Sequence, residues 1–204
     1  MSIQVAASHY ARTTYDTKAR WASYWHQADE VMRTRPSSCL EIGGGNGTIR
    51  RYLEAQGLPV VSVDIDSALG PDRVGDIRHL PCVDGEFDVV LCAEVLEHLP
   101  FPDVPQALRE IARVTRRWAI VSVPHTGRGF ELSFRIPPLR RVSFYGKLPG
   151  RRDFSFDGQH YWEVGAKNFS AAKVRDTFSA PFTIVRDFIV VENLYHHFYV
   201  LEKK

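Results

Sequence analysis

Short apolar runs alternate along the chain with stretches in which apolar residues recur every three or four positions. The apolar runs cover residues 40–42, 60–65, 87–92 and 118–123. Runs of this kind are typical of strands that are buried on both faces. The helical spacing occurs in residues 49–55 and 103–114. This alternation predicts an α/β fold with a doubly wound parallel sheet, whose ligands bind at the carboxyl edge of the strands.

A further amphipathic stretch lies before the first strand. Residues 13–34 carry aromatic and aliphatic side chains at helical spacing, and Pro36 ends the stretch. Such a helix packs on the edge of the sheet or, together with Tyr10 and Tyr15, helps to close a lid over a ligand. Val74 predicts one more short strand between the second and fourth strands.

A glycine cluster follows the first strand, in the stretch CLEIGGGNGTIRRYL at residues 39–53. Gly43, Gly45 and Gly47 allow a tight turn with positive φ, and they let a ligand lie directly on the main chain. The first amides of the following helix point unpaired N–H groups at the same place. The loop is therefore a candidate seat for a nucleotide or cofactor, although glycines alone also mark ordinary tight turns.

A carboxylate lies at the spacing that such a seat requires. Asp64 ends the second strand, 21 positions after Gly43. In a parallel βαβ unit this strand end lies beside the glycine loop, so its carboxylate can accept hydrogen bonds from ribose hydroxyls. Asp66 could take the same role, and either acid could instead cap a turn.

The composition narrows the class of protein. The chain has 204 residues, 44% of them hydrophobic, which suits a single domain with a substantial core. The net charge is +2, and no run approaches 18 apolar residues, so we expect no membrane span and no general nucleic-acid partner. The start of the chain lacks a secretion signal. Cys39, Cys82 and Cys92 lack CxxC spacing, which predicts free thiols in a cytoplasmic protein and no metal site.

Four motifs in order resemble those of the class I S-adenosylmethionine-dependent methyltransferases, especially the bacterial small-molecule branch. They are LEIGGGNG, VDID, GDIRHLP and FDVVLCAEVLEHLP, within residues 38–124. The resemblance implies a Rossmann-like, seven-stranded, mostly parallel sheet. Ser170 is placed to cap a helix through Phe178, and the two apolar runs after it resemble the closing antiparallel hairpin of that fold.

The resemblance divides a single methyltransferase domain, residues 1–204, into four parts. They are an N-terminal helical lid (1–37), a cofactor-binding core (38–124), a basic insertion that covers the acceptor (125–165), and a closing helix with a β-hairpin (166–204).

The resemblance also assigns the methionine end of S-adenosylmethionine. Glu41, Gly43 and Gly45 match the positions that hold this end in the family. Glu94, after the fourth strand, would flank the methionyl part and the entrance for the acceptor. The implied activity is methyl transfer to an oxygen or nitrogen of a small molecule.

The nucleoside end of the cofactor falls on two other motifs. By resemblance, Asp64 would bind the ribose and Ile65 would lie beside the adenine. Asp76 and Ile77 match the position at which the family contacts adenine, with the carboxylate accepting from the exocyclic amine.

Two other functions remain open. An NAD-dependent oxidoreductase would need a third glycine where Thr48 stands, and the only Tyr-x-x-x-Lys pair, Tyr199 and Lys203, falls in the last predicted strand. A cofactor-binding module that regulates or scaffolds a partner would keep the same binding residues and lack catalysis.

Residues 124–165 are irregular and basic. Between 127 and 152 they contain seven cations against Glu131 alone: Arg128, Arg135, Arg140, Arg141, Lys147, Arg151 and Arg152. This segment is a solvated face, a cover that grips a phosphate or carboxylate on the acceptor, or a contact with membrane lipids. The oligomeric state is left open.

Histidines are the candidate catalytic bases, because an imidazole can accept a proton near neutral pH. His125 directly follows the fifth strand, and His160 lies in GQHYWE. His98 is expected to line or brace the pocket. His196 and His197 alternate along a strand and should point to opposite faces, so they do not form a metal pair. An amine or carbon acceptor would need no base.

Overall fold

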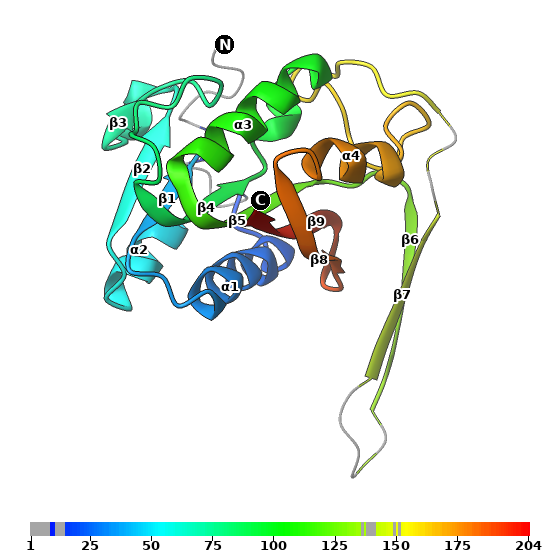
Figure 1. Ribbon diagram of the computed structural model, residues 1–204. Helices are drawn as coiled ribbons and strands as arrows, with labels where there is room; N and C mark the ends of the chain where they lie inside the picture. Colours follow the sequence, from blue (N-terminus) through cyan, green and yellow to red (C-terminus); the bar gives the residue numbers. More distant parts are fainter. Residues whose placement is uncertain (1–8, 11–14, 136, 138–141, 149, 151) are drawn as a thin grey trace.

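The computed structural model describes residues 9–10, 15–135, 137, 142–148, 150 and 152–204. Within these residues, seven strands form one sheet in the order β3-β2-β1-β4-β5-β9-β8 (Figure 1). Their bounds are β1 (Cys39–Ile42), β2 (Val60–Asp64), β3 (Arg73–Val74), β4 (Phe87–Ala93), β5 (Thr115–Pro124), β8 (Phe182–Val190) and β9 (Asn193–Lys203). The strands from β1 to β5 pair in parallel, whereas β9 runs antiparallel to β5 and β8. The predicted fold, including the closing hairpin, is confirmed.

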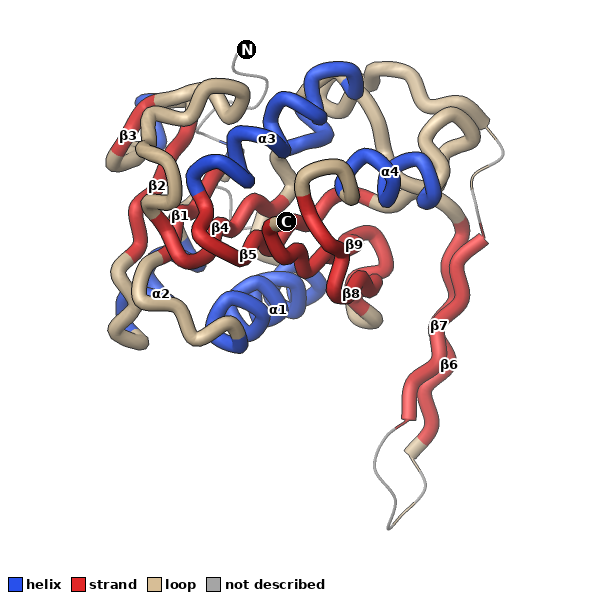
Figure 2. Tube along the Cα trace, in the orientation of Figure 1, coloured by secondary structure: helices blue, strands red, loops and turns tan. Residues whose placement is uncertain are grey.

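Helices cover both faces of the sheet (Figure 2). On one face, α1 (Lys18–Arg33) and α2 (Thr48–Ala55) bury Val31 and Leu53 in a core with β1 and β2. On the other face, α3 (Val104–Val114) and α4 (Ala171–Phe178) bury their apolar stripes in a second core. The sheet is therefore buried on both sides, as its continuous apolar runs predict.

Capping residues determine where the terminal helices begin. The Thr17 side chain accepts a hydrogen bond from the Arg20 amide, so α1 begins at Lys18. Residues 15–17 of the predicted helix are not helical, and residues 13–14 lie outside the described residues. Ser170 caps α4 in the same way, as predicted, by accepting from Lys173. The helix α1 packs across the face of the sheet, against β4, β5, β8 and β9, and not on its edge. Its Trp21 and Trp25 are exposed.

The segment after β5 contains a hairpin that we did not predict. The strands β6 (Arg128–Phe134) and β7 (Val142–Leu148) pair with each other alone and project away from the sheet (Figure 1). Residues 154–165 then return to the carboxyl edge of the sheet. There the Tyr161 amide donates to the Glu97 carbonyl at 2.8 Å, and the buried Trp162 donates its indole N–H to the Leu96 carbonyl at 3.1 Å. Three of the predicted arginines, Arg140, Arg141 and Arg151, lie outside the described residues.

Across the part of the chain that the structure describes, no helix has both the length and the apolar character needed to cross a bilayer.

Candidate functional site

The glycine loop connects β1 to α2 at the carboxyl edge of the sheet. Gly43, Gly45 and Gly47 have φ values of 73°, 52° and 67°, in the left-handed region that favours glycine. A Cβ on Gly43 would lie 2.3 Å from the Val95 side chain, so the loop has no room for a larger residue there. The Asn46 side chain accepts from the Thr48 amide at 3.1 Å and fixes the entry into α2. These contacts fix the conformation of the loop, and its main chain faces a cleft.

Two adjoining cavities lie against this loop. The larger, about 530 Å³, is lined by the loop, Glu41, Asp64 and residues 68–71. The smaller, about 60 Å³, is lined by the loop, Glu41 and Glu94, with Tyr15 and other residues near α1. Five of the predicted cofactor residues thus meet here: Glu41, Gly43, Gly45, Asp64 and Glu94.

Glu41 is a buried carboxyl group, and one of its two oxygens lacks a hydrogen bond within the described residues. Only 5% of the residue is exposed, and its Oε2 has no hydrogen-bond partner among the described residues. Burial raises the pKa of Glu41 to about 8, against a smaller opposing effect of Arg50. A buried carboxyl without a partner costs free energy, and a cationic ligand group would remove that cost. The side chain therefore suits a bound ammonium group.

The two aspartates at the end of β2 have different roles. The Asp66 side chain accepts from the Ala68 amide at 2.9 Å and caps a short helical turn, as one of the sequence alternatives predicted. Asp64 accepts from the Asp66 amide at 2.9 Å and lines the larger cavity. Burial raises the pKa of the Asp64 carboxyl group. Asp64 is thus the carboxylate of the pair that faces the cleft.

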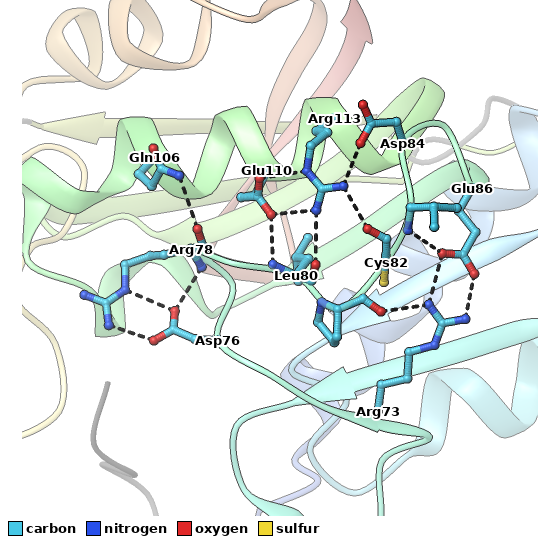
Figure 3. A network of polar contacts seen from close by, with 12 residues as sticks. Arg73, Asp76, Arg78, Leu80, Cys82, Asp84, Glu86, Gln106, Glu110 and Arg113 are labelled. Atoms are coloured by element: carbon cyan, nitrogen blue, oxygen red, sulfur yellow. Dashed lines mark hydrogen bonds and ion pairs between the residues drawn. The ribbon is translucent and has the colours of Figure 1, made fainter.

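Asp76 lies in a loop that ion pairs hold to α3 (Figure 3). Arg78 pairs with Asp76 at 2.7 Å and with Asp103 at 2.8 Å. The hydrogen bond from Arg78 holds the pKa of Asp76 well below its usual range. Arg113 donates to the carbonyls of Leu80 and Cys82 from α3 (Figure 3). The loop is rigidly placed, with Asp76 ionised.

The residues that were predicted to contact the adenine do not line the two cavities. Ile77 is buried in the core, and neither Ile65 nor Asp76 lines either cavity in the described structure.

Glu94 has an unusual backbone at the end of β4. Its φ of 55° is uncommon for a residue with a side chain. Ser122 donates to one carboxylate oxygen at 2.7 Å, and the His196 Nε2 lies 3.6 Å from the other. Strain of this kind persists only where the surrounding structure imposes it, which is common at functional sites. Glu94 lines the smaller cavity beside the glycine loop.

His125, one of the two predicted bases, is packed as a structural residue. Its Nδ1 lies 3.0 Å from the Nδ1 of His197, the two rings are stacked, and a Cβ on Gly165 would lie 2.6 Å from its Nε2. Burial, with the nearby charge of Lys147, lowers the pKa of His125 to about 3. These contacts make His125 a poor base. As predicted, His196 and His197 face opposite sides of the sheet, towards Glu94 and Asp187 respectively.

His160, the other predicted base, lies in a polar cluster beside the segment that follows Glu94. Its Nδ1 is 3.1 Å from Glu163 Oε1, and Tyr195 donates to the same carboxylate. Its ring packs edge-on against His98, with centroids 5.1 Å apart. Sequence reasoning missed Glu163 and Tyr195. The spacing of Glu163, three residues after His160, was a weak signal for the first, and the contact with Tyr195 joins residues too distant in the chain to predict.

Comparisons with known proteins agree with this geometry. The "Methyltransferase domain" family matches residues 40–123. An uncharacterized methyltransferase from Mycobacterium sp. (strain KMS) is 31% identical over 179 residues, covering 78% of this chain and 69% of that protein. A ubiquinone/menaquinone biosynthesis C-methyltransferase from Methylobacterium nodulans is 32% identical over 145 residues, covering 58% and 57%.

Solved structures show the same fold. The 1,6-didemethyltoxoflavin-N1-methyltransferase of Burkholderia thailandensis, solved with S-adenosylhomocysteine, has a TM-score of 0.65 at 20% identity and covers 97% of this chain and 84% of that one. The sequence relatives, together with the matching domain family, set aside the oxidoreductase and the non-catalytic module. The chain belongs to the class I S-adenosylmethionine-dependent methyltransferases and is an enzyme that uses S-adenosylmethionine.

Proposed function

We propose that this enzyme methylates an oxygen or nitrogen atom of a small-molecule acceptor that binds between Glu94 and His160. The observation that carries the proposal is the continuity of the site. Glu94 lines the cavity beside the glycine loop, and the segment Leu96–His98, which follows it, contacts the loop that bears His160. Cofactor and acceptor sites therefore adjoin at the carboxyl edge of the sheet, where ligands of such sheets bind.

The residues of the cleft fit the cofactor. Glu41 offers a buried, unpartnered carboxylate oxygen for the ammonium group, and the close approach of Gly44 to Glu41 leaves main chain rather than side chain facing the ligand. Asp64 is placed to accept from the ribose hydroxyls. When bound, S-adenosylmethionine supplies a methyl group on a sulfonium sulfur. Asp76, Ile65 and Ile77 are proposed for the adenine by resemblance.

Methyl transfer depends on alignment and on exclusion of water. The tyrosines Tyr10 and Tyr15 lie over the glycine loop, where they shield the cleft. For a hydroxyl acceptor, His160 is the imidazole placed to take the proton. Its Nδ1 faces the Glu163 carboxylate, which orients the ring and leaves Nε2 as the proton acceptor.

We further propose that the acceptor carries an anionic group. Arg128 and Arg152 line a cavity of about 780 Å³ at the base of the β6–β7 hairpin, next to Thr126. Guanidinium groups match carboxylate and phosphate geometry. Lys147 is committed elsewhere, since its Nζ donates to the carbonyls of His125 and Leu194.

The test is turnover with a panel of phenols, amines and their carboxylated or phosphorylated analogues, read as formation of S-adenosylhomocysteine. We expect turnover of an anionic oxygen or nitrogen acceptor. Arg152→Ala should raise KM for that acceptor and leave cofactor affinity unchanged. Turnover of carbon acceptors alone, or an Arg152→Ala variant that uses anionic and neutral analogues like the wild type, would contradict the proposal.

A further inference from the structure

Three side chains on the acceptor side of the site converge on one point. Glu97, His98 and His160 each place one possible ligand atom within 4.8 Å of the other two. Glu97 and His98 are neighbours in the short helical turn η3 (Leu96–His98), which follows β4. His160 comes from the insertion, which the hydrogen bond between the Tyr161 amide and the Glu97 carbonyl holds in place. The fold thus assembles a group that the spacing along the sequence does not reveal.

The carboxyl group of Glu97 is fully buried. None of the residue is exposed, and neither carboxylate oxygen has a hydrogen-bond partner within the described structure. A buried carboxylate whose oxygens lack hydrogen-bond partners costs free energy. A cation shared with neighbouring ligands satisfies both oxygens.

The Nδ1 atom of each imidazole lies beside an oxygen atom. The Nδ1 of His98 lies 3.0 Å from the Gln159 carbonyl oxygen, and the Nδ1 of His160 lies 3.1 Å from Glu163 Oε1. Both partners are oxygens that accept, so the proton of each ring belongs on Nδ1 and the lone pair on Nε2. Metal-binding histidines almost always donate their other ring N–H to a carboxylate or carbonyl in this way.

We propose that Glu97, His98 and His160 bind a divalent transition-metal ion, with Zn²⁺ and Mn²⁺ as the best matches. One carboxylate and two imidazoles are a ligand set that such ions accept, with further positions left for water or substrate. Three ligands of one tetrahedral zinc ion lie about 3.4 Å apart, as follows from bond lengths of about 2.1 Å. The candidate atoms lie within 4.8 Å of one another, so binding an ion requires them to move closer together.

If the proposed function holds, this metal site favours an oxygen nucleophile over a nitrogen nucleophile as the acceptor. A hydroxyl bound to the ion would have a lowered pKa and would release its proton to water. Its oxygen would then form the new bond to the methyl carbon while the carbon–sulfur bond breaks and the sulfur keeps the electron pair. When the ion is bound, His160 is a metal ligand, and the ion replaces it as the group that activates the hydroxyl; without the ion, His160 remains the candidate base.

Direct metal binding tests the site without any acceptor. Protein stripped with a chelator would be titrated calorimetrically with Zn²⁺, and Co²⁺ would be added as a spectroscopic probe of the coordination sphere. We expect one ion per chain and ligand-field bands typical of mixed nitrogen and oxygen ligands. Glu97→Gln and His160→Ala should each weaken zinc binding at least tenfold. Glu163→Gln should weaken it roughly 10- to 100-fold by loosening His160. The exposed His79→Ala is the matched control and should bind like the wild type.

Titration with S-adenosylhomocysteine serves as the folding control for each variant. Variants that bind this ligand normally but have lost zinc support the assignment. The proposal is overturned if folded wild-type protein binds no stoichiometric zinc, or if Glu97→Gln and His160→Ala both bind zinc as the wild type does. Normal zinc binding in a protein that turns over no oxygen or nitrogen acceptor would instead overturn the proposed function alone.

Discussion

The buried carboxyl of Glu41 should make cofactor affinity depend on pH. Its pKa is raised to about 8, and its Oε2 lines the cleft without a partner among the described residues. An ammonium group bound there requires the ionised carboxylate. The ammonium group of the ligand must also keep its proton, so affinity falls again in strongly alkaline solution. Affinity for S-adenosylhomocysteine should therefore rise from pH 6 to pH 8.

The magnitude follows from the fraction of ionised groups. With a pKa of about 8, about half of the Glu41 side chains are ionised at pH 8 and only about 1% at pH 6, so affinity should be roughly 50-fold lower at pH 6, or about 2.3 kcal/mol. Calorimetric titration at pH 6, 7, 8 and 9 and constant ionic strength measures this. Glu41→Gln is the matched variant, because it keeps the shape and removes the charge. It should bind more weakly at pH 8 and lose the decline towards pH 6.

The same group should affect stability in the opposite sense. The folded protein holds the Glu41 proton more tightly than the unfolded chain does, so its contribution to stability falls as pH rises from about 4.5 to about 8. Without ligand, Glu41→Gln should be more stable than the wild type at pH 8. Cofactor affinity that is constant from pH 6 to 8, or a glutamine variant with the wild-type pH profile, would refute the reasoning.

Further variants test other parts of the site. Asp64→Ala should weaken S-adenosylhomocysteine binding by roughly 1.5–3 kcal/mol, because charged hydrogen bonds to the ligand are lost. Asp66→Ala should mainly lower the stability of the fold, because it removes a turn cap. If calorimetry shows equal losses of affinity in the two variants, Asp64 is not a ligand-binding residue. Gly43→Ala should lower the melting temperature and abolish cofactor binding, because its Cβ would lie 2.3 Å from the Val95 side chain in a backbone with positive φ; normal melting and binding would show that the loop adapts. The pKa of His125 is lowered from 6.5 to about 3 in the folded protein. As pH drops from 6.5 towards 3, His125 is therefore protonated in the unfolded chain but not in the folded one, and the stability of the fold should decrease. Urea unfolding of His125→Gln at pH 7, 6 and 5 should show a flatter dependence, and an unchanged slope would rule out this contribution.

Most of the sheet was predictable because each strand carries a local signal. Continuous apolar runs marked β1, β2, β4 and β5, and Ser170 marked the start of α4. The hairpin of β6 and β7 was missed, although Phe130, Leu132 and Phe134 alternate with polar or small residues. Basic residues and prolines in the same segment favoured an irregular loop. These apolar side chains are exposed on the hairpin, so burial gave no guide to their structure.

The sequence predicted those site residues whose positions depend only on neighbouring elements of the chain. The spacing from Gly43 to Asp64 depends on one βαβ unit, and both residues line the same cleft. The placement of the loop that bears Asp76 was not predictable, since the ion pair of Arg78 with Asp103 links segments 25 positions apart. The same holds for His125, whose partner His197 is 72 positions away. Contacts between residues distant in sequence determine that His125 is buried and that His160 lies beside His98, at the proposed acceptor site.

A crystal structure of the complex with S-adenosylhomocysteine tests the central claim most directly. We predict that the ammonium group lies within hydrogen-bonding distance of Glu41, that the ribose hydroxyls donate to Asp64, and that the sulfur points towards Glu94 and His160. A ligand bound away from the glycine loop, or one whose sulfur faces away from Glu94 and His160, would contradict the account.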